Sequence, residues 1–349
     1  MRRAVAYALL LLSLTLWAYA SVWSAEWVYE DRAARTSAMQ ATGDWFSQRS
    51  VSAWTWRLTP TPRAAHALNL TLHLVIGGLV GLVAWRLGLT PLGAWAAATV
   101  WLLHPMAVEV AAYAKARGDA IALVGVLLAA LAATGRWWRG WSLVGIVLGS
   151  LLAIGGKQAG VVVLLLVPLV IWHGRDRHVA PRWAPWWMPS LVAAALIIGG
   201  VQWYGGLHAL INADGDGMAR VIDVTWAQWL FVQAGAVWYW ALASLWPALI
   251  TPDADIDRLS TLTRLSGLCL LAGAAVVAWQ MRTQAPVLSL SCAWVVLGVL
   301  PRLLVQTPRS YLNAAQFAVA FVGMALLAGL AVERAKAQFM SDAPLLKEI

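Results

Sequence analysis

Charged residues are scarce in this sequence. They make up 12% of its 349 residues, whereas soluble domains carry about 25%. Apolar residues make up 61% of the chain, and the mean hydropathy is +0.69. This shortage of charge excludes an ordinary soluble domain. It predicts an all-α, polytopic membrane protein, because long apolar runs are what a bilayer-crossing helix requires.

Cysteine is also rare. The two cysteines, Cys269 and Cys292, both fall within apolar runs, and neither stands near a set of His, Asp or Glu residues with metal-ligand spacing. We therefore interpret both as core residues and expect neither a disulfide framework nor a zinc site. No cofactor is predicted, and a requirement for a divalent metal ion stays open.

Acidic residues are fewer than basic ones, which gives a net charge of +9. A basic chain can bind nucleic acid, but the distribution of charge argues against that here. When sides are assigned by the rule that cytoplasmic loops carry excess Lys and Arg, almost all of the excess falls on the inner side, for example at Arg86, Arg282 and Arg334. The excess reflects membrane topology, so no nucleic-acid partner is expected.

Apolar runs predict about ten transmembrane helices, with both termini in the cytoplasm. The runs lie near residues 4–24, 66–85, 92–103, 119–134, 141–155, 159–172, 184–203, 264–280, 285–300 and 311–332. Segment 226–247 is also long enough to cross, but crossing would put Asp253, Asp255 and Asp257 inside and Arg282 outside. We therefore expect a re-entrant or interfacial helix there, among short amphipathic helices on the outer face.

One domain is predicted over residues 1–332, with outer loops near 25–65 and 204–225 and a short cytoplasmic tail over 333–349. The basic start and apolar run of residues 2–20 are typical of a cleavable signal peptide. Because the run continues and more spans follow, we favour a retained first span. Functional residues are expected in the outer loops, since loops on a rigid scaffold carry function.

Residues 104–119 (HPMAVEVAAYAKARGD) concentrate charge in this apolar chain. A charge at membrane depth costs roughly 3 kcal/mol on insertion scales, so such a cluster is a functional-site hypothesis by default. The alternative is a wet loop whose charges form an ion-pair scaffold, with Lys115 and Asp119 paired on one helix face. The candidate site residues are His104, Glu109, Lys115, Arg117 and Asp119.

Two other polar groups stand near the outer ends of predicted spans. Glu30 and Asp31 follow the first span as adjacent carboxylates, a pair that by itself is often only solvated. His66, Asn69 and His73 occur at i, i+3 and i+7, which is one face of a helix. That face could bind a metal ion, but a hydrogen-bonded packing stripe is the favoured interpretation.

Basic residues mark two further span ends. Lys157 follows two glycines that break a long apolar run, and it is either a snorkelling anchor at the head groups or a point-charge partner for a phosphate. Arg309 and Tyr311 precede the last predicted span. Together with Arg302, Arg309 could complete an outer cationic pocket.

The pattern His104-Pro105, Glu109 and Arg117-x-Asp119 resembles the His-Pro…Glu…Arg-x-Asp segment of the transmembrane O-mannosyltransferases that carry tetratricopeptide repeats. Those enzymes and their bacterial multi-spanning relatives are polyprenyl-phosphate-sugar-dependent glycosyltransferases of the GT-C class. A tetratricopeptide array does not follow here. The resemblance runs through residues 27–175 and returns at 238–253 and 301–332.

The resemblance also implies roles for the other candidates. Glu30-Asp31 looks like the Asp-Asp pair of the family's first outer loop, which implies Asp31 as catalytic base and Glu30 as an auxiliary carboxylate. Lys157 resembles the Lys of a Lys-Glu pair at the same helix break, and Arg309 and Tyr311 match part of a Glu-Arg-Tyr-x-Tyr segment. The residues implied to bind the carrier phosphate or the substrate are Arg117, Lys157, Arg309, Lys115, His104, Glu109, Asp119, His66, Asn69 and Tyr311.

The implied function is transfer of a monosaccharide from a polyprenyl-phosphate carrier to an acceptor hydroxyl, with inversion, on the periplasmic face of a bacterial inner membrane. A base must take the acceptor's proton as an oxocarbenium-like transition state forms. No loop carries a nucleotide-binding signature, which favours a lipid-linked donor. The sugar and the acceptor, whether protein, glycan or lipid, stay open. The rival interpretations are a lipid flippase or transporter and a catalytically degenerate assembly partner of a cell-envelope glycan system.

Overall fold

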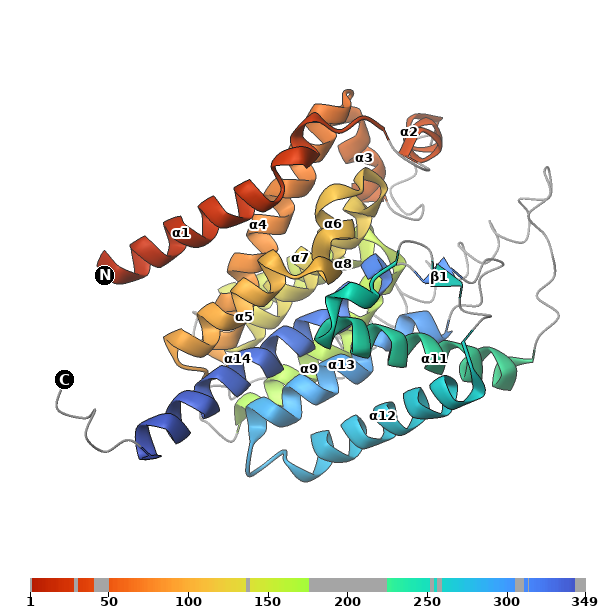
Figure 1. Ribbon diagram of the computed structural model, residues 1–349. Coiled ribbons are helices and arrows are strands. Elements are labelled where there is room, and N and C mark those ends of the chain that lie inside the picture. The colour runs from red at the N-terminus through yellow and green to blue at the C-terminus, as the bar shows by residue number, and fades with distance from the viewer. Residues whose placement is uncertain are drawn as a thin grey trace.

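The computed structural model describes residues 2–27, 31–40, 50–135, 139–175, 225–251, 254–255, 259–304, 311–312 and 314–342. These residues form a helical bundle (Figure 1), which confirms the all-α prediction. Among them, the strands are confined to two residues each, β1 (Ala254–Asp255) and β2 (Tyr311–Leu312). The two strands pair antiparallel.

The α-helices follow one another in this order: α1 (Arg2–Ala18), α2 (Asp31–Gln40), α3 (Ser50–Leu58), α4 (Pro62–Arg86), α5 (Pro91–Leu103), α6 (Val108–Ala112), α7 (Arg117–Ala133), α8 (Arg139–Gly156), α9 (Val163–Arg175), α11 (Trp226–Leu245), α12 (Thr261–Gln280), α13 (Pro286–Leu304) and α14 (Ala318–Asp342). Short 3₁₀ turns link several of them: η1 (Ala20–Ser24), η2 (Pro105–Ala107), η3 (Ala114–Ala116), η4 (Gln158–Val162), η5 (Pro247–Leu249) and η7 (Ala314–Phe317).

Five helical segments are long and apolar enough to cross a membrane, and these indicate an integral membrane protein. They are Pro62–Arg86, Ala114–Ala133, Thr261–Gln280, Pro286–Leu303 and Ala314–Ser341. The bent pair Pro91–Leu103 and Pro105–Ala112, with 59° between its arms, makes a sixth if it counts as one span.

The prediction of about ten spans is therefore wrong. Three of the expected runs form apolar helices of only 10–17 residues, namely Val5–Ala18, Gly140–Gly156 and Ala159–His173. At 1.5 Å per residue such helices reach about 15–26 Å, short of a hydrocarbon core of about 30 Å. Each apolar run was counted as a span, although runs such as 141–155 and 159–172 are shorter than the roughly 20 residues that a straight span needs. The expected span at 184–203 lies outside the described residues.

Helix starts follow local sequence rules. Thr61 caps α4 by accepting a hydrogen bond from the Ala64 N–H, and Thr90 caps α5 in the same way. Each threonine precedes a proline at the first helical position, where the missing N–H costs nothing. Between these two helices Gly88 adopts φ 104°, which only glycine tolerates readily.

Close helix crossings at glycines hold the bundle together. A Cβ at Gly125 of α7 would lie 2.3 Å from the backbone N of Ala153 in α8. A Cβ at Gly298 of α13 would lie 2.5 Å from the backbone N of Ala320 in α14. Backbones approach this closely in membrane bundles because dispersion forces, not the hydrophobic effect, drive association there. Helix α7 is the central element, since almost all of its side chains are buried.

The two ends of the bundle differ in charge. We call the basic end the one at which α4 finishes with Arg86, α12 turns into α13 at Arg282, and α14 passes Arg334. There Glu333 accepts a hydrogen bond from the Thr90 N–H at 3.0 Å. We call the polar end the one that carries α2, α3, α6, η3 and η7. The start of α1 and the end of α14 both lie toward the basic end (Figure 1).

Helix α11 lies at the polar end. The indole N–H of Trp229 donates to the Leu303 carbonyl at 3.1 Å, and Nε of Arg302 donates to Gln233 at 2.9 Å. Further along, the Trp240 ring stacks on Phe317 with centroids 5.2 Å apart. These partners belong to the last turn of α13 and to η7. Helix α11 is not among the segments apolar enough to cross.

Candidate functional site

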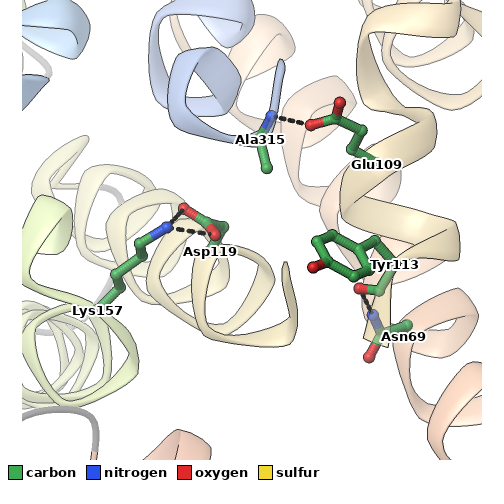
Figure 2. Close-up of polar contacts among 6 residues, drawn as sticks. All are labelled: Asn69, Glu109, Tyr113, Asp119, Lys157 and Ala315. Carbon is green, nitrogen blue, oxygen red and sulfur yellow. Dashed lines mark hydrogen bonds and ion pairs between the residues drawn. The ribbon is translucent and has the colours of Figure 1, made fainter. Parts of the chain in front are cut away.

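Residues 104–119 lie at the centre of the polar end and contact elements that are distant in sequence. Figure 2 shows three of these contacts, which reach α4 through Asn69, the end of α8 through Lys157, and η7 through Ala315. The segment is not one helix. It bends through η2, α6 and η3 before α7 begins, and each bend turns a different side chain toward a different partner.

Asp31 is the first residue of α2, and its side chain is fully buried. Its Oδ1 accepts a hydrogen bond from the backbone N–H of Lys115 at 2.8 Å. A charge-assisted bond of this kind fixes the carboxylate and ties α2 to η3. The predicted base therefore lies beside the 104–119 segment, as expected for a shared site.

Arg117 is buried at the start of α7. One terminal nitrogen, Nη1, donates to the Thr59 hydroxyl at 2.7 Å, and the guanidinium lies 4.1 Å from the centroid of the Trp56 ring. Asp31 is close enough to interact with it electrostatically. Among the described residues, Nε and Nη2 have no hydrogen-bond partner. These two nitrogens form one edge of the guanidinium, the edge that binds two oxygens of an oxyanion side by side.

Asp119 and Lys157 form a tight ion pair. The Lys157 ammonium lies 2.6 Å from both carboxylate oxygens, and the side chains of Lys157 and Asp119 are 24% and 8% exposed. The expected pairing of Asp119 with Lys115 on one helix face is wrong, because Lys115 belongs to η3 and Asp119 to α7. Lys157 is held by a partner of its own, so it is not a loose anchor at the head groups.

Glu109 and His104 stabilise the bend of the 104–119 segment. Glu109 accepts a hydrogen bond from the backbone N–H of Ala315 at 2.9 Å, which joins α6 to η7. Nδ1 of His104 accepts from the Met106 N–H at 3.1 Å, and its ring lies 5.0 Å from the Phe321 ring. Glu109 therefore fixes the bend of the 104–119 segment against η7, and His104 packs it against α14.

The stripe His66, Asn69 and His73 on α4 is buried, and its contacts are hydrogen bonds. The Asn69 amide donates to the Tyr113 carbonyl at 2.8 Å, and Nε2 of His73 donates to the Leu102 carbonyl at 3.1 Å. Nothing in the described part of the chain brings three metal-ligating side chains together. These contacts match the packing stripe that the sequence favoured.

The structure brings together only part of the predicted set. Asp31, Lys115 and Arg117 lie together, Lys157 joins through Asp119, and Glu109 faces η7 instead. Two of the remaining candidates, Glu30 and Arg309, lie outside the described residues, and Tyr311 is described only as part of β2.

Sequence reasoning missed Trp56 and Thr59, which contact Arg117. Trp56 lies in the last turn of α3 and Thr59 directly follows that helix, so their spacing of three residues was the available signal. No family model, characterised protein or solved structure matches this chain.

Proposed function

We propose that this protein is a membrane glycosyltransferase that moves a monosaccharide from a polyprenyl-phosphate carrier to an acceptor hydroxyl. The observation that carries the proposal is Arg117, a buried guanidinium beside a buried carboxylate, whose Nε and Nη2 have no hydrogen-bond partner among the described residues. The GT-C resemblance of residues 104–119 adds the substrate class.

A phosphate suits Arg117 for physical reasons. Burying a cation without hydrogen bonds to its remaining N–H groups is costly, and an anionic ligand offsets that cost. The edge formed by Nε and Nη2 matches two oxygens of a phosphate, and stacking on Trp56 holds the guanidinium in place. The phosphate gains charge as the bond to the sugar breaks. A fixed cation in a partly dry site stabilises that charge more strongly than water does.

Asp31 supplies the base in this proposal. The carboxylate takes the proton of the acceptor hydroxyl, the acceptor oxygen bonds to the anomeric carbon, and the bond from that carbon to the phosphate oxygen breaks with its electron pair staying on the phosphate. A single displacement inverts the anomeric centre. The hydrogen bond from Lys115 orients the carboxylate. Glu30 is the auxiliary carboxylate, and Lys157 and Arg309 are further cations for the carrier.

The same proposal assigns the sides of the membrane. The basic end faces the cytoplasm and the polar end the periplasm, in line with the larger excess of basic over acidic residues at the former. The carrier then enters sideways from the outer leaflet, because its chain loses about 0.8 kcal/mol for each CH₂ that leaves the bilayer. Helix α11, rich in Trp and packed against α12, the last turn of α13 and η7, lies at the outer interface.

The test combines binding and turnover in lipid nanodiscs. Arg117→Gln should lose retention of polyprenyl phosphate in native mass spectrometry, and Arg117→Lys should recover little, because Lys lacks the paired donor edge. Arg282 is the matched control, since it also lies 4.1 Å from a Trp ring centroid but at the basic end. Asp31→Asn should keep carrier binding and lower release of polyprenyl phosphate from its monosaccharide esters by about 10²–10⁴-fold.

One observation favours the alternative of a non-catalytic assembly partner. Asp31 and Glu109 each accept a hydrogen bond from a backbone N–H. Such bonds join distant elements of the fold and need no catalytic role. In that case the parent protein releases no polyprenyl phosphate from any monosaccharide ester. Asp31→Asn then changes nothing beyond stability, because an Asn oxygen still accepts from Lys115.

A further inference from the structure

A second group of buried polar side chains lies apart from Arg117. We call it the polar seam and define it as Tyr19, His66, Asn69, His73 and Trp101. Each of these side chains is at most 4% exposed. Each has one polar atom without a hydrogen-bond partner among the described residues: Tyr19 Oη, His66 Nδ1, Asn69 Oδ1, His73 Nδ1 and Trp101 Nε1.

The seam is continuous along α4. The chain around η1 covers one side of it, with the Tyr19 ring 5.0 Å from the His73 ring and the Glu26 carbonyl 3.5 Å from Nε2 of His66. At the end of the seam farthest from His66, the ring centroids of Trp101 and His73 lie 6.0 Å apart. The segment that follows α1 therefore runs antiparallel to α4 and encloses its polar face.

The hydrogen bonds already present determine what each histidine offers. A carbonyl oxygen only accepts, so Nε2 of His73 must donate to Leu102, and Nε2 of His66 must donate to Glu26. In the neutral rings Nδ1 is then a bare acceptor. Asn69 uses its amide donors on Val110 and Tyr113, which leaves its oxygen as a third acceptor.

Two donors complete the seam. The Trp101 indole offers an N–H, and Tyr19 offers an O–H. Burial raises the pKa of Tyr19, so its hydroxyl stays neutral and can both donate and accept. Three acceptors, one donor and one hydroxyl inside a bundle are costly if left unmatched. Water is the small molecule that both donates to and accepts from such groups.

We propose that the polar seam binds a short file of ordered water molecules between η1, α4 and α5. Residues 66–73 of α4 rise about 10 Å, which is the length of roughly three waters in hydrogen-bonded contact. Buried waters typically bridge otherwise unmatched polar groups in this way. The inference does not depend on the proposed glycosyltransferase activity.

The bound water also links the end of α1 to the bundle. Most of the described side chains of α1 are exposed, and the buried ones, Leu11 and Thr15, form one stripe with Tyr19, which follows the helix. Thr15 bonds within its own helix, to the Leu11 carbonyl. Leu11 packs in the hydrophobic core, and bound water gives Tyr19 a polar link to α4, so the seam helps to fix the end of α1 on the bundle.

Radiolytic footprinting tests the proposal, because X-ray pulses convert bound water into hydroxyl radicals at the place where it sits. Trp294 is the matched control, since it is as buried as Trp101 but its indole N–H donates to the Val319 carbonyl at 3.0 Å. In nanodiscs made with ¹⁸O water we expect Trp101 and Tyr19 to incorporate the label at least 10-fold faster than Trp294. Equal, slow labelling of Trp101 and Trp294 would overturn the proposal.

A mild variant gives an independent readout. Tyr19→Phe removes one water partner and little volume, so the thermal midpoint should fall and labelling of Trp101 should drop at least threefold. In a dry seam the same change removes an unmatched hydroxyl, so the midpoint should rise and Trp101 labelling should not change. A raised thermal midpoint or unchanged labelling of Trp101 would each count against the bound water file.

Discussion

Replacing Lys157 by Met tests whether the ion pair at the end of α8 is part of the fold or part of a ligand site. The Lys157 ammonium lies 2.6 Å from both oxygens of Asp119, whose side chain is 8% exposed. Removing one partner of a fully buried pair costs about 3–5 kcal/mol, because the other charge stays buried alone. Lys157 is 24% exposed, so water replaces it in part, and we expect a loss of about 2–3 kcal/mol.

The assay is the free energy of unfolding in detergent, measured for a double-mutant cycle. Lys157→Met and Asp119→Asn should each destabilise the protein, and the double variant should recover most of the loss, because no unpaired charge remains. Lys336→Met is the matched control, because Lys336 is exposed on α14 and should change stability by less than about 0.5 kcal/mol. The reasoning fails if Lys157→Met is as stable as the parent. Loss of carrier binding at unchanged stability would leave Lys157 only its proposed role at the carrier phosphate.

Two further predictions concern packing and orientation. Gly125→Leu should prevent folding or cost more than about 3 kcal/mol of stability, because a Cβ there would lie 2.3 Å from the Ala153 backbone. Gly273→Leu is the control and should be neutral, because a Cβ there meets nothing within 4 Å. Equal yields of folded protein from the two variants would contradict the predicted clash. In a background without Cys269 and Cys292, a cysteine at the exposed Thr36 should react with an impermeant reagent in intact spheroplasts. One at the exposed Thr283 should react only after permeabilisation, and the opposite result would reverse the proposed sides.

The candidate site was only partly readable from sequence. The charge of residues 104–119 predicted where polar contacts would gather, and the spacing of His66, Asn69 and His73 predicted one buried face. The contact partners of these side chains were not predictable from the sequence. The pairing of Asp119 with Lys115 assumed one continuous helix, whereas the chain bends at η3 and Asp119 reaches Lys157 instead. The predicted number of spans was wrong for a different reason, since short apolar runs were counted as spans although their helices are too short to cross.

The sequence by itself determined the membrane class, the helical secondary structure and several helix starts, such as that at Thr61-Pro62. These features follow from composition and from interactions within about four residues, which the local sequence contains in full. The tertiary structure alone decided which buried groups meet. Asp31 and Lys115 are 84 residues apart, and Glu109 and Ala315 are 206 apart. Such contacts exist only once α7 and its neighbours have packed, because glycine crossings and helix bends set the direction in which each side chain points.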